Sequence, residues 1–429
     1  MKRISALWVL FLVGNTASAA VAKSDGYNLN ELFEASLKRS EAIGIQTELV
    51  NQAEEKYSQA KAAFFPTISA TGIYLLQQSP SATATTLSPA EQTTAKITAS
   101  QPLFRGMAEY ASLSQQNLQV TAQISAKRQA AAELYASVVS NFYSILSMEQ
   151  ILKDFQEEIT VYEKRISDLN ARIKIGRSKM SEALTVRSAL DTLAAQAEEA
   201  KGQLSAAREA FAFLTGLDRN AIVKETDKIE IKPDTLDNYL KRIEERPDVK
   251  SARDTLEAVE KGVEIARAGH FPTLSLAGNY YFKRPGIAQN QNWDASVTAT
   301  LPLFSGGLVN AQVRQAAAAT RQSDLTLAQA RRLADQEIRT GYSNLQSGMS
   351  RVKLLERATQ TAYENYQAQI KDYKLGLVTN LDVLQAITSW HESLRALDAL
   401  KFQAKLDFVK LETSAALRPS AQTLQAIGK

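Results

Sequence analysis

The stretch Pro302-Leu303-Phe304-Ser305-Gly306-Gly307 repeats an earlier motif, Pro102-Leu103-Phe104-Arg105-Gly106, at an offset of 200 residues. A second pair of matching motifs lies upstream of these two. Phe65-Pro66-Thr67 returns as Phe271-Pro272-Thr273, at an offset of 206. Motifs that recur in the same order predict an internal two-fold repeat, in which two copies of one structural unit differ by a loop length.

Between its two motifs, each copy carries two segments that alternate between apolar and polar residues. They span 67–75 and 95–103 in the first copy and 273–282 and 293–301 in the second. Each is long enough for a tilted transmembrane β-strand, which needs about 9–11 residues with one apolar and one polar face. Aromatic residues at the strand ends favour a membrane location, although alternation alone also fits a half-buried soluble hairpin. The predicted β-hairpins are 67–103 and 273–302.

Four strands are too few to close a membrane barrel, which needs about eight. An open sheet in lipid would leave unpaired backbone groups at its edges, and hydrocarbon does not tolerate them. If these strands span a membrane, the chain must oligomerise, and two copies would supply 8 strands and three copies 12.

After Gly106 the apolar period changes from 2 to about 3.5, which predicts a coiled-coil helix. The segment 107–173 has 67 residues, or about 100 Å of α-helix at 1.5 Å per residue. Gly176 ends it and a shorter helix, 180–216, returns. A helix over 237–268 is expected to stack on the end of that return.

The second copy repeats this plan, with Gly376 at its turn and a last helix over 381–417. A helix over 36–64 leads into the first strand. The expected organisation is therefore mainly α with a small β part. Its segments are a first repeat over 21–217 with a helical hairpin at 107–216, an equatorial linker at 218–236, a second repeat over 237–417 with a helical hairpin at 307–417, and a tail at 418–429.

The N-terminus has the pattern of an export signal. Lys2 and Arg3 precede a short apolar run, 4–13, and Ala17-Ser18-Ala19 offers a cleavage site, so residues 1–20 are predicted to be a signal peptide. The remaining chain has no apolar run of 18 residues, and a helical membrane anchor is therefore not expected.

Composition limits the chemistry. The chain has no cysteine and two histidines, and its net charge of +4 falls to +2 without the two signal-peptide cations (4 − 2). Such a balance does not indicate a nucleic-acid partner. His270 and His391 lie far apart and suit corner and packing roles. We expect no enzyme activity, no catalytic or metal site and no cofactor.

Three longer stretches carry a family resemblance: 270–276, 302–316 and 373–384. With the duplicated motifs they resemble the TolC family of outer-membrane efflux proteins over essentially the whole mature chain. The resemblance implies a homotrimer with one 12-stranded β-barrel in the outer membrane of a Gram-negative cell, and a helical tunnel in the periplasm. It implies an exit duct for a tripartite efflux pump or a type I secretion system. The implied partners are outer-membrane lipid, a periplasmic adaptor (membrane fusion) protein and an inner-membrane transporter, proton-driven or ABC.

The residues alone leave a second reading open, that of an exported coiled-coil structural protein without a pore. No feature of the sequence identifies the transported cargo.

The two glycine turns carry the candidate periplasmic gate. Glu182 follows Gly176 by six residues, and Asp382 follows Gly376 by six. The resemblance gives Asp382 a role in constricting the pore and Glu182 a role in tying helices together. A capping box, Thr379 with Asp382, is the alternative explanation for that acid.

The second turn departs from the family's pattern at two positions, because Val378 replaces a basic residue and Gln385 an acidic one. Arg177 and Lys179, on the first turn, are candidate replacement partners for the two acids.

Prolines and glycines at the strand–helix corners are predicted to be fold determinants. Proline lacks a ladder N–H and suits a strand end, and glycine lets the chain swing into a helix. The corner residues are Pro66, Pro102, Gly106, Pro272, Pro302, Gly306 and Gly307.

Overall fold

The computed structural model describes residues 26–78, 90–226 and 229–419. The predicted signal peptide, most of the first strand–strand loop and the end of the C-terminal tail lie outside these residues. The chain divides into two compact units, which we describe separately: residues 1–39 with 141–228, and residues 40–140 with 229–429. No helix in the described ranges is long and apolar enough to cross a membrane.

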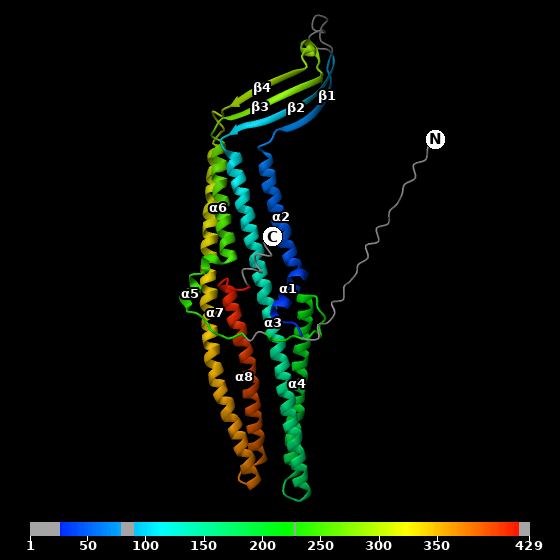
Figure 1. Ribbon diagram of the computed structural model, residues 1–429, viewed down its shortest axis with the longest axis vertical. Coiled ribbons are helices and arrows are strands. Elements are labelled where there is room, and N and C mark those ends of the chain that lie inside the picture. Colours follow the sequence, from blue (N-terminus) through cyan, green and yellow to red (C-terminus); the bar gives the residue numbers. More distant parts are fainter. Residues whose placement is uncertain (1–25, 79–89, 227–228, 420–429) are drawn as a thin grey trace, which may run out of the picture. The chain divides into compact units, whose positions relative to one another are not determined.

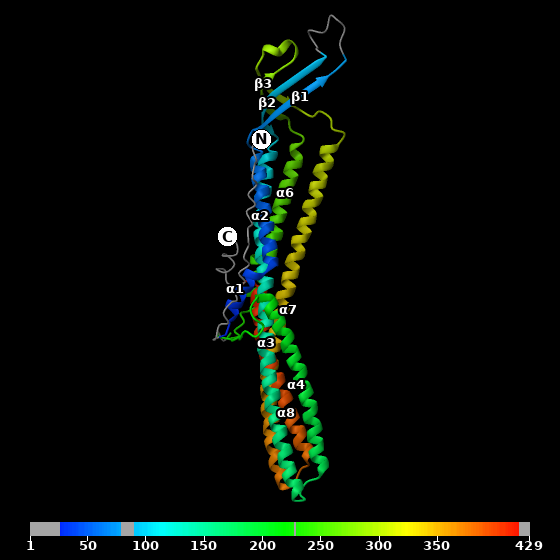
Figure 2. The same ribbon diagram turned by 90° about the vertical axis from the view of Figure 1, so that its right-hand side faces the viewer.

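The first unit is helical. It contains α1 (Leu29–Arg39), the C-terminal part of α3 (Ala108–Lys174) and α4 (Met180–Thr215), which runs beside α3 (Figures 1 and 2). Asn141 Nδ2 donates to the carbonyl of Ala207 at 2.9 Å across the α3–α4 pair. The predicted coiled-coil seam is visible on α3, where Phe155, Tyr162 and Leu169, seven residues apart, are buried.

The second unit carries one antiparallel sheet in the order β1-β2-β3-β4. The strands are β1 (Thr67–Leu76), β2 (Glu91–Arg105), β3 (Thr273–Lys283) and β4 (Trp293–Thr300). All four predicted strands are confirmed, and their starts agree within four residues. The loop between β3 and β4 holds a short 3-10 helix, η2 (Gly286–Asn290).

Helices enter and leave this sheet at one end (Figure 1). The helix α2 (Glu41–Ala62) leads into β1, and α6 (Pro247–Ala268) leads into β3. The helices α3 and α7 (Leu308–Leu375) leave from β2 and β4, and α8 (Asn380–Ser414) returns along α7. Ile338 and Leu345 of α7 are buried with Phe408 and Leu411 of α8 in one hydrophobic cluster.

Two of the predicted helices are wrong in their boundaries. The segment 237–268 is not one helix but α5 (Leu236–Leu240), the 3-10 helix η1 (Ile243–Glu245) and α6. Pro247 has no N–H to donate and forces the residue before it out of the α region, so Arg246 is extended, with φ −62° and ψ 138°. A helix can begin at such a proline but cannot run through it.

The N-terminal helix, predicted as 36–64, is also interrupted. Helix α1 ends at Arg39, and Ser40 is extended (φ −68°, ψ 113°) and caps α2, its side chain accepting from the N–H of Ile43. Serine favours this position because its oxygen satisfies a helix N–H that has no partner within the helix.

Candidate functional site

The sheet has two chemically different faces, and its register defines them. In-register partners on neighbouring strands share a face. One row across the four strands joins Ala70, Ile97, Tyr280 and Trp293. We call this side the apolar face. Further large side chains on it are Ile68, Tyr74, Leu76, Leu276, Phe282 and Val297.

The apolar face is uncovered in the described chain. Ile68 is 73% exposed, Trp293 71% and Val297 64%. A contiguous exposed patch of this kind marks a surface that meets lipid or another protein. The alternation predicted from sequence thus places its apolar residues outside the core.

The opposite, polar face holds a hydrogen-bonded row. Ser69, Thr98, Asn279 and Asp294 lie side by side in register. Asn279 Oδ1 accepts from Thr98 Oγ1 at 2.7 Å and from Lys96 Nζ at 3.3 Å, and Asn279 Nδ2 donates to Asp294 Oδ1 at 2.7 Å. Asp294 also pairs with Arg284 at 3.3 Å. This face can therefore line a water-filled space, while the other cannot.

The corner residues lie where strands meet helices. Pro66 and Pro272 stand immediately before β1 and β3, and Pro102 lies near the end of β2, at a shift in its register with β3. At Gly106 φ is +65°, and a Cβ there would stand 2.7 Å from the carbonyl oxygen of Ala268, so the close approach of α6 requires glycine.

In the second half of the chain the same motif follows β4. Pro302 lies outside any strand, and Gly306 and Gly307 have φ of +62° and +83°. Their fold-determining role stays a prediction.

The two glycine turns share one backbone geometry. At Gly176 (φ +73°) the N–H of Arg177 donates to the carbonyl of Arg172, and the N–H of Gly176 donates to Ile173. At Gly376 (φ +78°) the corresponding bonds are Leu377 to Asp372 and Gly376 to Tyr373. Both are Schellman motifs, which require a left-handed residue and favour glycine. Each turn belongs to a different compact unit and is described by itself.

The acids beyond the two turns are held differently. The capping box at the start of α8 is present: Asp382 Oδ2 accepts from Thr379 N–H at 2.8 Å and from Thr379 Oγ1 at 2.6 Å. These bonds from the side chain and backbone of Thr379 lower the pKa of Asp382 below its ordinary value. At the start of α4, Lys179 occupies the N-cap without a side-chain bond, and Ser178 Oγ donates to Glu182 at 2.5 Å.

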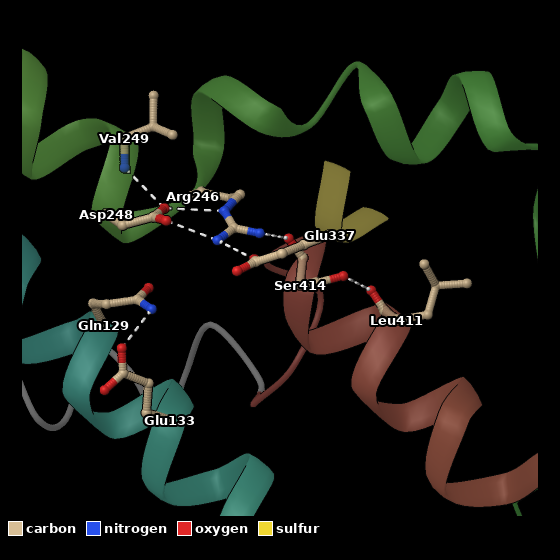
Figure 3. A network of polar contacts seen from close by, with 8 residues as sticks. All are labelled: Gln129, Glu133, Arg246, Asp248, Val249, Glu337, Leu411 and Ser414. Atoms are coloured by element: carbon tan, nitrogen blue, oxygen red, sulfur yellow. Dashed lines mark hydrogen bonds and ion pairs between the residues drawn. The ribbon is translucent and has the colours of Figure 1, made fainter. Parts of the chain in front are cut away.

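One polar network was not predicted from the sequence. Arg246 donates to both carboxylate oxygens of Asp248, from Nε at 3.0 Å and Nη2 at 2.7 Å, to Glu337 at 2.8 Å and to the carbonyl of Ser414 at 2.9 Å (Figure 3). Its side chain is only 6% exposed. Burial alone would lower the pKa of Arg246, but the two carboxylates raise it above its ordinary value. The network joins the start of α6 to the middle of α7 and to the end of α8.

No group of three or more metal-binding side chains occurs among the residues that the structure describes. His391 lies on α8, 1% exposed, with its ring 4.3 Å from that of Trp390. Burial, and then the nearby charge of Arg395, lowers the pKa of His391 to about 4, so this histidine is neutral at pH 7.

These features define a class of protein: helical hairpins joined to a small antiparallel sheet that has one exposed apolar face. Comparisons with known proteins identify the family. Residues 32–217 and 239–416 match the family model described as "Outer membrane efflux protein". The chain belongs to this family. Its membership confirms the resemblance to the TolC family and the outer-membrane localisation. The name of the family describes efflux rather than catalysis.

Relatives and solved structures agree with this assignment. The outer membrane protein TolC of Escherichia coli is 23% identical over 66% of this chain and 61% of its own length. TolC of Vibrio cholerae is 21% identical over 96% of this chain and 94% of its own length. The crystal structure of the outer membrane protein VceC from Vibrio cholerae aligns with a TM-score of 0.79 at 21% identity, over 90% of this chain and 95% of that one.

Proposed function

We propose that this protein is an outer-membrane exit duct, a passive conduit that serves a tripartite efflux pump or a type I secretion system. The observation that carries the proposal is the two-faced sheet, with an uncovered apolar face and a hydrogen-bonded polar face, in which β1, β2 and β3 have 10, 15 and 11 residues. A sheet with lipid on one side and water on the other needs this division, whereas a soluble sheet would have its apolar face covered by a core, and here that face is exposed in the described chain. The family membership supports the same function.

The proposed assembly is a homotrimer. Three copies of the four-stranded sheet supply 12 strands, enough to close a barrel and leave no edge in lipid. The long helices α3, α4, α7 and α8 then form a periplasmic tunnel. The proposed partners are a periplasmic adaptor protein and a proton-driven or ABC transporter of the inner membrane, which supplies the energy and sets most of the cargo choice.

We also propose that Asp382 helps to gate the periplasmic end. An aspartate carboxyl is ionised near neutral pH, and the bonds to Thr379 lower its pKa further, so each copy presents a fixed negative charge beside the turn. Asp382→Asn should raise single-channel conductance and weaken block by divalent cations in planar bilayers. Thr379 can still donate to the amide oxygen of the variant, so the helix start is largely kept.

Matched variants on the first turn separate a gate from a cap. Glu182→Gln and Arg177→Ala test whether that turn contributes a tie or a latch to the closed state. Unchanged conductance and unchanged divalent block in Asp382→Asn would leave the acid with its capping role alone.

Neighbouring residues on opposite faces of β4 test the main proposal. Val297, mid-strand, lies on the apolar face, and Ser296 on the polar face. Lysine in the lipid-facing position costs about 2–4 kcal/mol per chain near the bilayer midplane, and lysine facing the lumen costs little. Val297→Lys should therefore disappear from the outer-membrane fraction and lose its heat-modifiable oligomer, while Ser296→Lys should retain both.

The competing function is an exported coiled-coil protein without a pore. It predicts a water-soluble periplasmic oligomer in which neither lysine changes the fractionation. Recovery of the wild-type chain in that form, without conductance in bilayers, would exclude the duct.

A further inference from the structure

The sheet region carries an excess of positive charge. Residues 67–105 and 273–300, which contain the four strands, have four cations and two anions, a net charge of +2 (4 − 2). The chain without its predicted signal peptide also has a net charge of +2, so the remaining residues balance to zero (2 − 2). The six charged residues of the sheet region are Glu91, Lys96, Arg105, Lys283, Arg284 and Asp294.

Lys96 differs from the other five in its position. Among the strands that the structure describes, the other charged residues stand at the first, second or last position of β2, β3 or β4, whereas Lys96 is the sixth of 15 residues in β2. Lys96 pairs in register with Tyr281, and Thr98 pairs with Asn279, so Lys96 lies on the polar face. An ionisable side chain within a membrane segment faces water or a partner group and marks a pathway for ions or substrates.

A tyrosine ring holds Lys96 beside a second cation. The Nζ atom of Lys96 lies 5.9 Å from the centre of the Tyr281 ring, and the guanidinium carbon of Arg284 lies 4.2 Å from it. Cation–π attraction acts within about 6 Å of a ring centre. The ring therefore attracts both cations and offsets part of their mutual repulsion.

The charges of this cluster do not cancel. Arg284 Nη1 lies 3.3 Å from Asp294 Oδ2, so the carboxylate offsets the guanidinium charge. Lys96 Nζ donates to a neutral group, Asn279 Oδ1, at 3.3 Å, and makes no ion pair with any residue in the described ranges. An ammonium group has three donors. Each copy thus presents one unbalanced positive charge on the polar face, with donors left for water or for an anion.

We infer that Lys96, with Arg284 beside it, forms a cationic band on the lumenal wall of the duct, and that this band favours solutes with exposed carboxylate or phosphate groups. The inference rests on the proposed trimeric duct and adds a selectivity element to it. Three copies would place three Lys96 ammonium groups at one level of a barrel with a net charge of +6 (3 × 2). The sign of the band is opposite to that of Asp382, the proposed acidic gate.

Screening by salt sets how far the band acts. Twelve strands about 4.8 Å apart and tilted by about 40° give a barrel with a backbone radius of about 12 Å. Charges are screened over about 30 Å at 0.01 M salt and about 3 Å at 1 M. The band therefore acts on ions throughout the lumen at low salt, and only on solutes that touch the wall at high salt.

Reversal potentials across a KCl gradient in planar bilayers test the band. Asp382→Asn serves as the background, because the acids beside the turn would otherwise oppose the band. In this background, Lys96→Gln should lower the chloride-to-potassium permeability ratio about two-fold near 0.01 M salt and change it little near 1 M. Asp294→Asn removes an anion from the same cluster and should raise the ratio at low salt.

Two control variants separate the band from net charge and from packing. Lys96→Arg keeps the charge and should retain the ratio of the background. Arg105→Gln removes one cation at the end of β2, where Glu109 pairs with it at 3.6 Å, and should change the ratio less than Lys96→Gln does.

The outcomes separate this inference from the proposed function. Unchanged ratios in Lys96→Gln and Asp294→Asn, in variants that still form pores, overturn the band and leave the duct intact. An equal effect of Arg105→Gln also overturns it, since selectivity would then follow the net charge of the barrel. If Lys96→Gln does not assemble, Asp294→Asn decides, and an unchanged or lower ratio overturns the band. A wild-type chain that forms no pore overturns both the duct and the band.

Discussion

Two matching helices, one in each half of the chain, have the same length but begin by different local means. Helices α2 and α6 both have 22 residues, and their first residues, Glu41 and Pro247, are 206 positions apart, the same offset as the first residues of β1 and β3. Yet α2 begins at a serine cap, and α6 begins at a proline behind a buried arginine. The common length of α2 and α6 follows the repeated motifs, while the contacts that stabilise the start of each helix differ.

Removing Arg246 is the strongest way to break this comparison. Arg246→Ala leaves Asp248 and Glu337 without their cation and the carbonyl of Ser414 without its donor. Breaking a buried ion pair costs about 3–5 kcal/mol, and because these two carboxylates are partly exposed we expect about 3 kcal/mol. Urea unfolding followed by helix content should show a decrease of this size in the free energy of unfolding.

The control for this variant is Arg339→Ala. Arg339 pairs with Asp335 one turn away on the surface of α7, at 2.8 Å, and such exposed pairs contribute little to stability because water screens them. Equal midpoint shifts for the two variants would contradict the special role of Arg246.

The returning helices α8 and α4 differ in a buried histidine. His391 is buried on α8, while Asp191, 200 residues earlier, is exposed on α4. In the folded state the pKa of His391 is about 4, against an ordinary value of 6.5, so between these pH values the unfolded chain binds more protons. Stability is therefore complete above about pH 6.5 and falls as the pH falls toward 4, by about 2 kcal/mol between pH 7 and pH 5.

The measurement compares unfolding midpoints at pH 7 and pH 5. His391→Gln should reduce the difference in the free energy of unfolding by about 2 kcal/mol. An identical pH dependence in wild type and His391→Gln would show that this ring does not titrate on unfolding.

Sequence alone predicted what depends on local periodicity. The starts of β1 and β3, the 67 residues of α3 and the glycine turns follow from alternation, a 3.5-residue period and the preference of glycine for the left-handed region. The break before α6 could also have been predicted, because Pro247 lies inside the predicted helix 237–268. That prediction was wrong because it gave the many helix-forming residues more weight than the proline.

The remaining contacts could not be read in this way. Glu337 and Ser414 lie 91 and 168 residues from Arg246, and no periodic pattern links them. The burial of His391 depends on how α8 packs, and the segment 301–305 is not a strand, although the matching motif in the first half forms the end of β2.

The start of α2 gives a smaller test of the comparison. Ser40 Oγ accepts from the N–H of Ile43 at 3.4 Å, a long bond, so Ser40→Ala should cost about 0.5–1 kcal/mol, toward the low end for helix caps. Ser40→Asp should retain the cap. At α6 the N-cap Arg246 makes no side-chain bond to the helix backbone. A neutral Ser40→Ala variant would mean that α2, like α6, is started by its tertiary contacts.

The strand–helix corner offers a reciprocal pair of variants. Met107 has φ +66°, where the second half has Gly307 at +83° with open space around it. A non-glycine residue in the left-handed conformation costs about 1–2 kcal/mol. Replacing it by glycine removes this cost, but glycine also raises the entropy of the unfolded chain, which offsets part of the stabilisation. Met107→Gly should therefore stabilise by about 0.5 kcal/mol, and Gly307→Ala should destabilise by about 1 kcal/mol. If both changes were neutral in urea unfolding, the backbone at the corner would relax freely, and its glycines would serve the close approach seen at Gly106 rather than the turn itself.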